Sequence, residues 1–173
     1  WAGYLPFLES GGYREARWWS ADGWQWRTSN AIEAPRYLRR VDGEWQHRLF
    51  GQWQPLTLTS PAVHLTWFEA DAWCRWAGRR LPSEAEWEFA ASGRGQERQF
   101  PWGDDEDVCA HAVVARAGLG GTSIGLVSLG TGVSSGVVAV GTWHDESRDG
   151  VVDLGGNVAE WVLDAAAGYA SPC

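Results

Sequence analysis

Two helix-start signals follow one another near the middle of the chain, and they constrain the fold more than any other feature. In Thr66–Glu69 and in Ser83–Glu86 a hydroxyl residue is followed three positions later by a glutamate. This is a capping box, which satisfies backbone N–H groups that lack a partner at a helix start. Each segment then runs to a glycine, Gly78 or Gly93, where a positive φ costs little. The sequence therefore predicts two short helices joined by Arg79–Pro82.

The spacing of apolar residues predicts which face of each helix is buried. An amphipathic helix repeats its apolar side chains every three or four residues. The pattern occurs at Phe68, Ala72, Trp73, Trp76 and Ala77 in the first helix, and at Trp87 and Ala90 in the second. Cys74 lies on the first helix, and we expect it to be a small buried apolar side chain.

A β-hairpin is predicted earlier in the chain. Tyr37–Val41 and Glu44–Leu49 flank Asp42-Gly43, which is the favoured pair for a type I′ turn. Gly51 permits a further bend. Nearer the start, Trp1–Ser10 has the apolar spacing of a helix, provided that its proline lies in the first turn.

The region after the two helices shows weaker patterns. Gly118–Gly136 is rich in Gly, Ser and Thr without a period, and it predicts a long loop, either a solvated insertion or a lid. Val137–Trp143 is rich in β-branched residues and predicts a strand.

Composition limits the classes of partner. The chain has 173 residues, enough for one domain, and a formal net charge of −8, which argues against a nucleic-acid or anionic membrane surface. It has 14 Trp and no Met, so aromatic rings must fill much of the core. No apolar run reaches the about 18 residues of a membrane span. An odd cysteine count without a disulfide framework favours a reducing, cytoplasmic location.

Three segments, in order, resemble one known family. PAVHLTWFEADAWCRWAGRRLPSEAEWEFAA, the FPWGD of Phe100–Asp104 and the GVVDLGGNVAEW of Gly150–Trp161 are similar to signature blocks of the sulfatase-modifying-factor superfamily. That superfamily includes formylglycine-generating oxidases and the carboxy-terminal domains of ergothioneine and selenoneine sulfoxide synthases. The opening run GYLPFLESGGYREARWWSADGWQWR resembles the sulfoxide-synthase branch more closely. The resemblance implies an α+β, C-type-lectin-like fold with two short helices, small twisted antiparallel sheets and much loop.

The last block is a candidate calcium site. Calcium prefers several oxygen ligands, commonly carboxylates and carbonyls around a glycine turn. By resemblance, Asp153 and Glu160 supply side-chain oxygens, while Gly156 and Val158 supply carbonyls. Acidic residues beside glycines more often mark a solvated turn, so the spacing alone is a weak signal. A second calcium site of the family needs an asparagine where this chain has Ala110-His111, and we expect that site to be absent.

Residues for redox chemistry are not evident. A facial iron triad needs two histidines and a carboxylate, but the histidines His47, His64, His111 and His144 are scattered, and we expect His64 to be structural, in a buried strand. In sulfoxide synthases the iron ligands lie in a separate amino-terminal helical domain. Formylglycine-generating oxidases bind copper through a cysteine pair near their carboxy-terminal end. Cys74 and Cys109 do not match those positions, and Cys173 alone cannot form a pair, so we assign no catalytic residue.

The sequence therefore predicts a single domain over residues 1–173, truncated at both ends. Its expected role is to shape the substrate cleft of an iron(II)-dependent sulfoxide synthase that forms a C–S or C–Se bond on hercynine, a betaine of histidine. The expected cofactors are structural Ca²⁺, and Fe²⁺ supplied only by an attached helical domain. One alternative is a formylglycine-generating oxidase without its catalytic cysteines, acting on a cysteine-containing peptide. Another is a lectin-like binding module without catalysis.

Overall fold

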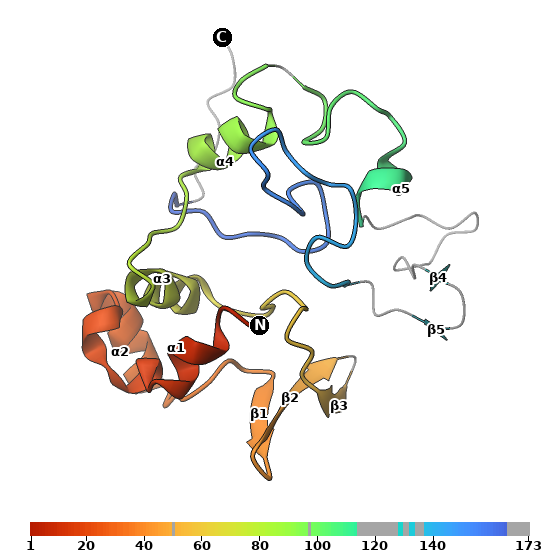
Figure 1. Ribbon diagram of the computed structural model, residues 1–173. Helices are drawn as coiled ribbons and strands as arrows, with labels where there is room; N and C mark the ends of the chain where they lie inside the picture. The colour runs from red at the N-terminus through yellow and green to blue at the C-terminus, as the bar shows by residue number, and fades with distance from the viewer. Residues whose placement is uncertain (50, 97, 114–127, 130–131, 134–136, 166–173) are drawn as a thin grey trace.

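The computed structural model describes residues 1–49, 51–96, 98–113, 128–129, 132–133 and 137–165. Figure 1 shows a layer of helices and a three-stranded sheet in the first half of the chain, with a loop-rich second half above it. The elements are α1 (Leu5–Glu9), η1 (Gly12–Arg14), η2 (Ala16–Trp18), α2 (Ala21–Ser29), β1 (Leu38–Val41), β2 (Glu44–Leu49), β3 (Gln52–Pro55), α3 (Trp67–Trp76), α4 (Glu84–Ala91), α5 (Val108–His111), β4 (Ser128–Leu129) and β5 (Gly132–Val133). The architecture is α+β. Among the described helices, none is long and apolar enough to cross a membrane.

Both predicted capping boxes are confirmed. At the start of α3 the Thr66 hydroxyl accepts from the N–H of Glu69, and the Glu69 carboxylate accepts from the N–H of Thr66 at 2.7 Å. The same reciprocal pair forms at the start of α4. The glycines after the two helices, Gly78 and Gly93, have φ values of 67° and 65°. The helix boundaries therefore follow from local chemistry.

The predicted hairpin is also confirmed. Asp42 and Gly43 have φ values of 50° and 89°, as a type I′ turn requires at both central positions. The β1–β2 register pairs Leu38 with His47. After the bend at Gly51 the chain continues as β3, which pairs antiparallel with β2 to complete a three-stranded sheet.

The N-terminal helix is shorter than predicted. It begins at Leu5, with its proline in the first turn, and residues 2–4 form a turn. Helix α2 was not predicted. Ser20 caps its start by accepting from the N–H of Gly23 at 3.1 Å. The signal was weak because no glutamate follows the cap and the apolar residues of α2 do not gather on one face.

The prediction of a strand at Val137–Trp143 is wrong, since the residues form a loop and a turn. The reason is that backbone N–H groups of this segment, which a strand would donate to a neighbouring strand, donate to side chains instead. The N–H of Val138 donates to the Asn157 side chain at 3.0 Å, and that of Gly141 donates to Asp153 at 3.0 Å. Most of the predicted loop at Gly118–Gly136 lies outside the described residues, which contain the short β4–β5 pair.

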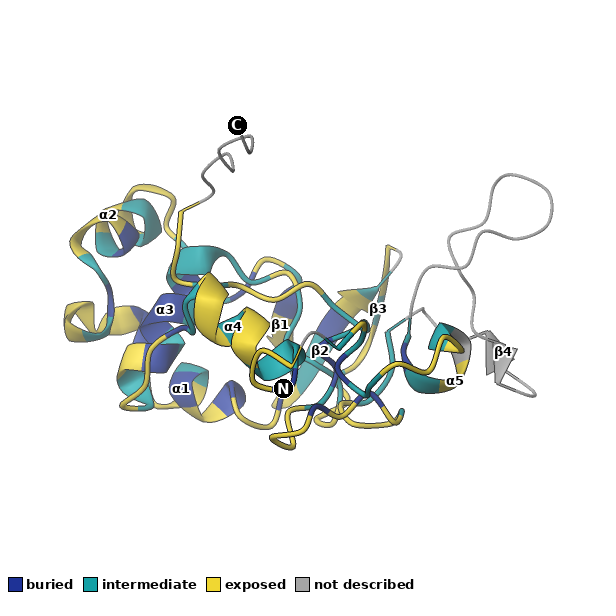
Figure 2. Ribbon diagram, turned by 90° about the horizontal axis from the view of Figure 1, so that it is seen from above, coloured by how far each residue is buried: buried dark blue, intermediate teal, exposed yellow. Residues whose placement is uncertain are grey.

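The core lies between α1, α3 and β1, where Figure 2 shows the buried segments. Its members are Trp1, Tyr4, Leu5, Phe7, Tyr13, Trp19, Leu38 and Ala72. A polar network crosses it: the Tyr13 hydroxyl donates to Glu69 at 2.7 Å and lies 2.9 Å from the hydroxyl of Tyr4. Burial of Ala72 and Cys74 confirms part of the predicted α3 face, but the face also buries Glu69 and Asp71.

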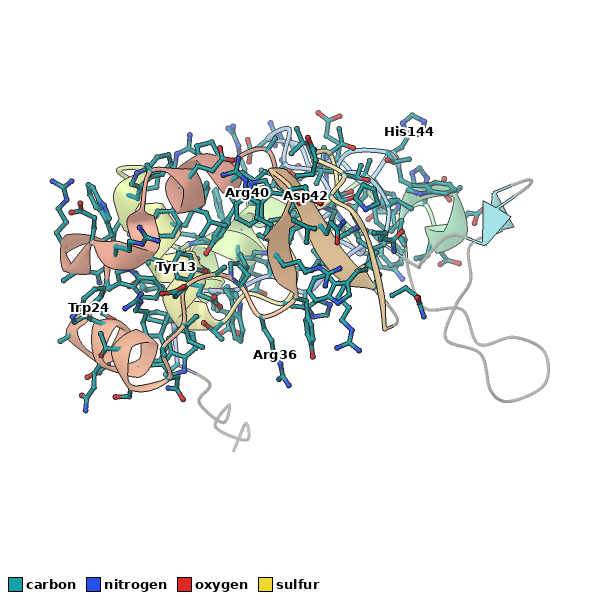
Figure 3. The ribbon with its side chains drawn as sticks, turned by 90° about the horizontal axis from the view of Figure 1, so that it is seen from below. Tyr13, Trp24, Arg36, Arg40, Asp42 and His144 are labelled. Atoms are coloured by element: carbon teal, nitrogen blue, oxygen red, sulfur yellow. The ribbon has the colours of Figure 1, made fainter. Side chains whose placement is uncertain are left out.

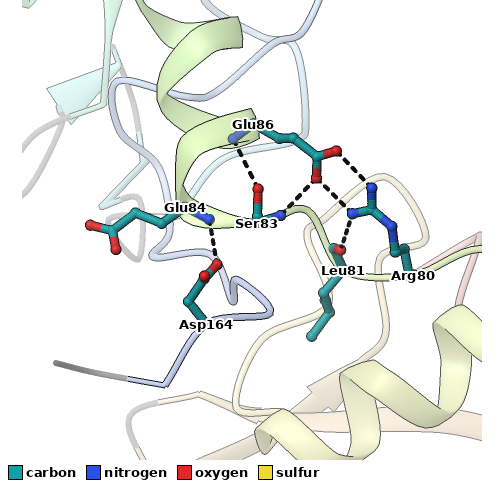
Figure 4. A network of polar contacts seen from close by, with 6 residues as sticks. All are labelled: Arg80, Leu81, Ser83, Glu84, Glu86 and Asp164. Atoms are coloured by element: carbon teal, nitrogen blue, oxygen red, sulfur yellow. Dashed lines mark hydrogen bonds and ion pairs between the residues drawn. The ribbon is translucent and has the colours of Figure 1, made fainter.

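The segment from Glu160 to Asp164 is held against the helices by hydrogen bonds. The indole N–H of Trp161 donates to the carbonyl of Leu65, and that of Trp67 donates to the carbonyl of Val162. Figure 4 shows that Asp164 accepts from the backbone N–H of Glu84 at the start of α4. These contacts bring the last signature block beside α3 and α4, although it is far away in the sequence.

Candidate functional site

The last signature block forms a tight turn with an unusual backbone. Asp153 and Asn157 both have left-handed φ values, 63° and 66°, a conformation that Asp and Asn tolerate better than most residues. The buried Asp153 carboxylate accepts from the N–H of Gly141. Between the two residues, Gly156 has no space for a side chain, because an added Cβ would lie 2.3 Å from the carbonyl oxygen of Val113. The turn is thus shaped by several independent constraints.

A second carboxylate beside this turn was missed by the sequence analysis. Asp145 is 1% exposed, and its backbone carbonyl accepts from the N–H of Asp153 at 2.9 Å. Its Oδ2 accepts from the N–H of Gly155 at 2.6 Å, while its Oδ1 is buried without a hydrogen-bond partner. No sequence signal marks Asp145, because it lies in a charged stretch that is typical of an exposed turn.

Glu160, near the end of the block, contacts α4. Its Oε2 accepts from the indole N–H of Trp87 on α4 at 2.5 Å. Desolvation raises the pKa of the Glu160 carboxyl, the Trp87 N–H opposes that rise, and the nearby charges of Asp153 and Asp145 add to it. The pKa of Asp145 is also raised, first by burial and then by Asp153. The three carboxylates are therefore close enough to repel one another.

The chemistry of this set fits a hard cation in part. Among the described residues, no ion pair joins Asp145, Asp153 or Glu160 to an arginine or histidine. Repulsion between unpaired carboxylates is relieved by a bound cation, and oxygen donors suit calcium. Within the same residues, however, no group of three or more His, Cys, Asp or Glu side chains is placed to hold one metal. A calcium ion here would need backbone carbonyls beside the two predicted carboxylates.

The carbonyls proposed as ligands lie on the same turn. Gly156 accepts from the N–H of Val158 at 2.8 Å, which leaves one lone pair of its carbonyl oxygen for another partner. The Asn157 side chain fixes this turn by donating to the carbonyl of Val138 at 3.2 Å and accepting from its N–H. The four predicted ligands, Asp153, Gly156, Val158 and Glu160, lie on one short stretch of the chain. Whether they bind calcium stays a prediction.

A large cleft of about 1420 Å³ opens beside the same block. Its walls come from the chain start, the end of β2, the loop before α3, α3, α4, and from Leu154 and residues 158–161. Aromatic rings line it, among them Trp73, Trp87, Trp161 and Tyr37, together with the carboxylate of Glu160. Arg48 and Glu86 also line it, and Glu86 is paired with Arg80. Apolar rings beside the carboxylate of Glu160 are suited to an organic cation.

The histidines do not gather into a site within the described residues. His47 is buried on β2, and desolvation lowers its pKa. The prediction that His64 lies in a buried strand is wrong: it is exposed in a loop, with φ of 61° and its ring against Tyr37. His144 is exposed, whereas His111 packs on Trp102.

Cys74 behaves as predicted. It is 4% exposed, and burial, followed by the charge of Asp71, raises the pKa of its thiol, which makes the reactive thiolate scarce. The side chain of Cys109 and all of Cys173 lie outside the described part of the chain. The described residues therefore hold a cleft and a carboxylate-rich turn, but no iron triad and no thiol pair.

Residues 2–169 match the sulfatase-modifying factor enzyme 1-like domain. The chain is 39% identical over 126 residues to a hercynine oxygenase of Mycolicibacterium thermoresistibile, which covers 71% of this chain and 26% of the relative. It is 42% identical over 72 residues to the formylglycine-generating enzyme of Mus musculus, covering 41% and 19%. It is 36% identical over 104 residues to the inactive C-alpha-formylglycine-generating enzyme 2 of Bos taurus, covering 60% and 33%.

Proposed function

Because this chain belongs to the family of sulfatase-modifying factor enzyme 1-like domains, we propose that it is the substrate-shaping domain of an iron(II)-dependent sulfoxide synthase acting on hercynine. The similarity to hercynine oxygenases extends over 71% of the chain and supports this branch. The chain spans about a quarter of the length of those relatives, 26% of the M. thermoresistibile protein. We also propose that the domain has the C-type-lectin-like fold that the family resemblance implies.

The observation that carries the proposal is the aromatic cleft. The trimethylammonium group of hercynine cannot donate a hydrogen bond, so rings and a nearby carboxylate are the groups that recognise it. Trp73, Trp87 and Trp161 supply rings, and Glu160 supplies the negative charge. The described residues do not offer an iron triad, and we place iron in a separate domain, where it supplies oxygen activation. The part of this chain is to bind and orient the substrate.

Titration of the chain with hercynine, followed by isothermal calorimetry, tests this role. We expect hercynine to bind at least tenfold more tightly than histidine, which has the same ring and carboxylate but an ordinary ammonium group. Loss of one cation–π contact of about 0.5–2 kcal/mol weakens binding roughly 2- to 30-fold. Trp161→Leu, in the cleft, should show this loss, while Trp53→Leu on β3, outside it, should not. Equal affinity for hercynine and histidine would contradict the proposal.

A formylglycine-generating oxidase is the second candidate, favoured by the local similarity to the mouse enzyme. It predicts binding of a cysteine-containing peptide rather than hercynine. The similarity to an inactive relative supports a third candidate, a binding module without catalysis. Sequencing the gene on both sides separates them: an upstream His-x-x-x-His-x-Glu motif selects the sulfoxide synthase, a downstream cysteine pair selects the oxidase, and neither motif selects the binding module.

We propose calcium as the structural cofactor of the domain. Replacing Asp153 and Glu160 together by alanine should remove the increase in melting temperature that calcium causes. For a ligand at a hundred times its Kd the stabilisation is about 2.7 kcal/mol, or roughly 5–10 °C for a chain of this size. The measurement is the difference in melting temperature between calcium and excess chelator. Strain from alanine at Asp153, which has a left-handed φ, lowers both temperatures equally and so cancels in this difference.

Asp149→Ala is the matched control, since this acidic residue lies near the turn but pairs with Arg94. It should keep the full difference between calcium and chelator. If the double variant melts lower than the unmodified chain by the same number of degrees in calcium and in chelator, these residues do not bind calcium.

A further inference from the structure

Away from the cleft, a stack of three rings holds His111 in one orientation. Trp102 stacks on both Phe100 and His111, with ring centroids 4.9 Å and 5.1 Å away and nearly parallel planes. The Nε2 atom of His111 is 3.1 Å from the carboxylate of Asp105. A carboxylate accepts, so in the neutral ring Nε2 carries the proton and Nδ1 is left with a lone pair. That Nδ1 atom is buried and has no hydrogen-bond partner.

Asp145 presents a second atom of the same kind nearby. Its Oδ2 is held by the N–H of Gly155, and its Oδ1 is buried and unpartnered although the residue is 1% exposed. Trp102 connects the two groups, because Trp102 and Asp145 both lie against Gly155. A Cβ added at Gly155 would be 2.6 Å from the edge of the Trp102 ring and 3.0 Å from the Asp145 carboxylate. The charge of His111 is the smallest of the influences on the pKa of Asp145, and it lowers that pKa.

Both side chains are thus anchored through one polar atom, His111 Nε2 and Asp145 Oδ2, while the second polar atom of each has no hydrogen-bond partner. Protein metal sites show this arrangement: a ligating histidine donates its second ring nitrogen to a carboxylate, and a ligating carboxylate is itself hydrogen-bonded. We propose that His111 Nδ1 and Asp145 Oδ1 bind a divalent transition-metal ion of the zinc or cobalt type. This inference does not depend on the proposed enzymatic function.

Charge favours a cation here over a bridging water. A water molecule could donate to both lone pairs, but it would leave the repulsion between Asp145 and the neighbouring Asp153 and Glu160 unchanged. A divalent ion relieves it. The imidazole nitrogen selects the class of metal, since zinc and its neighbours accept nitrogen donors while calcium and magnesium prefer oxygen. With no third side chain in reach among the described residues, water or backbone carbonyls complete the coordination.

Titration of the 173-residue chain with Co²⁺, followed by visible absorption and by competition with Zn²⁺, tests the site. We expect one equivalent of metal to bind, with His111→Ala and Asp145→Asn each raising Kd more than tenfold. Asp105→Asn, which only releases the ring orientation, should raise Kd by about 10- to 100-fold through weaker positioning. His144→Ala is the matched control. This residue precedes Asp145, is exposed and lies at the edge of the molecule in Figure 3.

A second measurement keeps the test independent of variant folding. In the unmodified chain, the ¹⁵N chemical shift of His111 Nδ1 should move on addition of Zn²⁺, while that of Nε2 should change less. The proposal is overturned if His111→Ala binds as tightly as the unmodified chain, because surface groups then hold the metal. It is also overturned if the unmodified chain binds no Zn²⁺ and the Nδ1 shift stays constant, the result expected for a buried water.

Discussion

Replacing Glu69 by alanine is expected to destabilise the chain by about 2–5 kcal/mol, because this carboxylate serves two structures at once. It closes the capping box of α3 through the N–H of Thr66, and a lost cap costs about 0.5–2 kcal/mol. It also accepts a hydrogen bond from the Tyr13 hydroxyl in the core, and a buried donor left without a partner costs about 1–3 kcal/mol. For a chain of this size the melting temperature should fall by roughly 5–15 °C, which calorimetry or circular dichroism measures.

Glu86→Ala is the matched control for this experiment. Glu86 occupies the same position in the capping box of α4, but it is exposed and pairs with Arg80, as Figure 4 shows. Its loss should cost about as much as the cap alone, so the melting temperature should fall less than it does for Glu69→Ala. Similar losses for both variants would show that capping, rather than the buried contact with Tyr13, sets the stability of the region. Tyr13→Phe tests the same contact from the other side and should leave the α3 cap intact.

Gly156→Ala is expected to destabilise the chain by about 3 kcal/mol, the upper end of the cost of overpacking. The added Cβ would lie 2.3 Å from the carbonyl oxygen and 3.0 Å from the carbonyl carbon of Val113. These are backbone atoms, which cannot rotate away as a side chain can. The N–H of Asn157 also donates to that carbonyl at 2.8 Å, so the clash should displace the whole turn. Urea unfolding measures the cost.

Gly78→Ala separates this steric effect from backbone strain. Gly78 has φ of 67° at the end of α3, and an added Cβ meets no atom within 4 Å. A left-handed residue other than glycine costs about 1–2 kcal/mol. We therefore expect Gly78→Ala to cost less than Gly156→Ala and to leave the calcium response of the turn unchanged. If Gly156→Ala proves as mild as Gly78→Ala, the close approach to Val113 does not constrain the turn.

The elements that were predicted correctly are those whose signals lie within a few residues. The caps at Thr66 and Ser83 and the turn at Asp42-Gly43 satisfy their own backbone groups, so neighbouring residues suffice to determine them. The family membership was predicted for a similar reason, since its signature blocks are continuous stretches of sequence. The calcium ligands, which came from the family resemblance, stay a prediction.

Burial and partnership of polar groups were decided only by the tertiary structure. Nothing near Asp145 in the sequence distinguishes it from its exposed neighbours, yet the fold buries it against Gly155. Glu69 reads as a helix cap, and only packing of the N-terminal segment brings Tyr13 to it. Val137–Trp143 has the composition of a strand, but side chains of the distant turn occupy its backbone. The sequence by itself determined the two capped helices, the hairpin and the family, because those depend on local hydrogen bonds and continuous motifs. The carboxylate-rich turn and the cleft depend on contacts between residues far apart in the chain, which only the folded structure specifies.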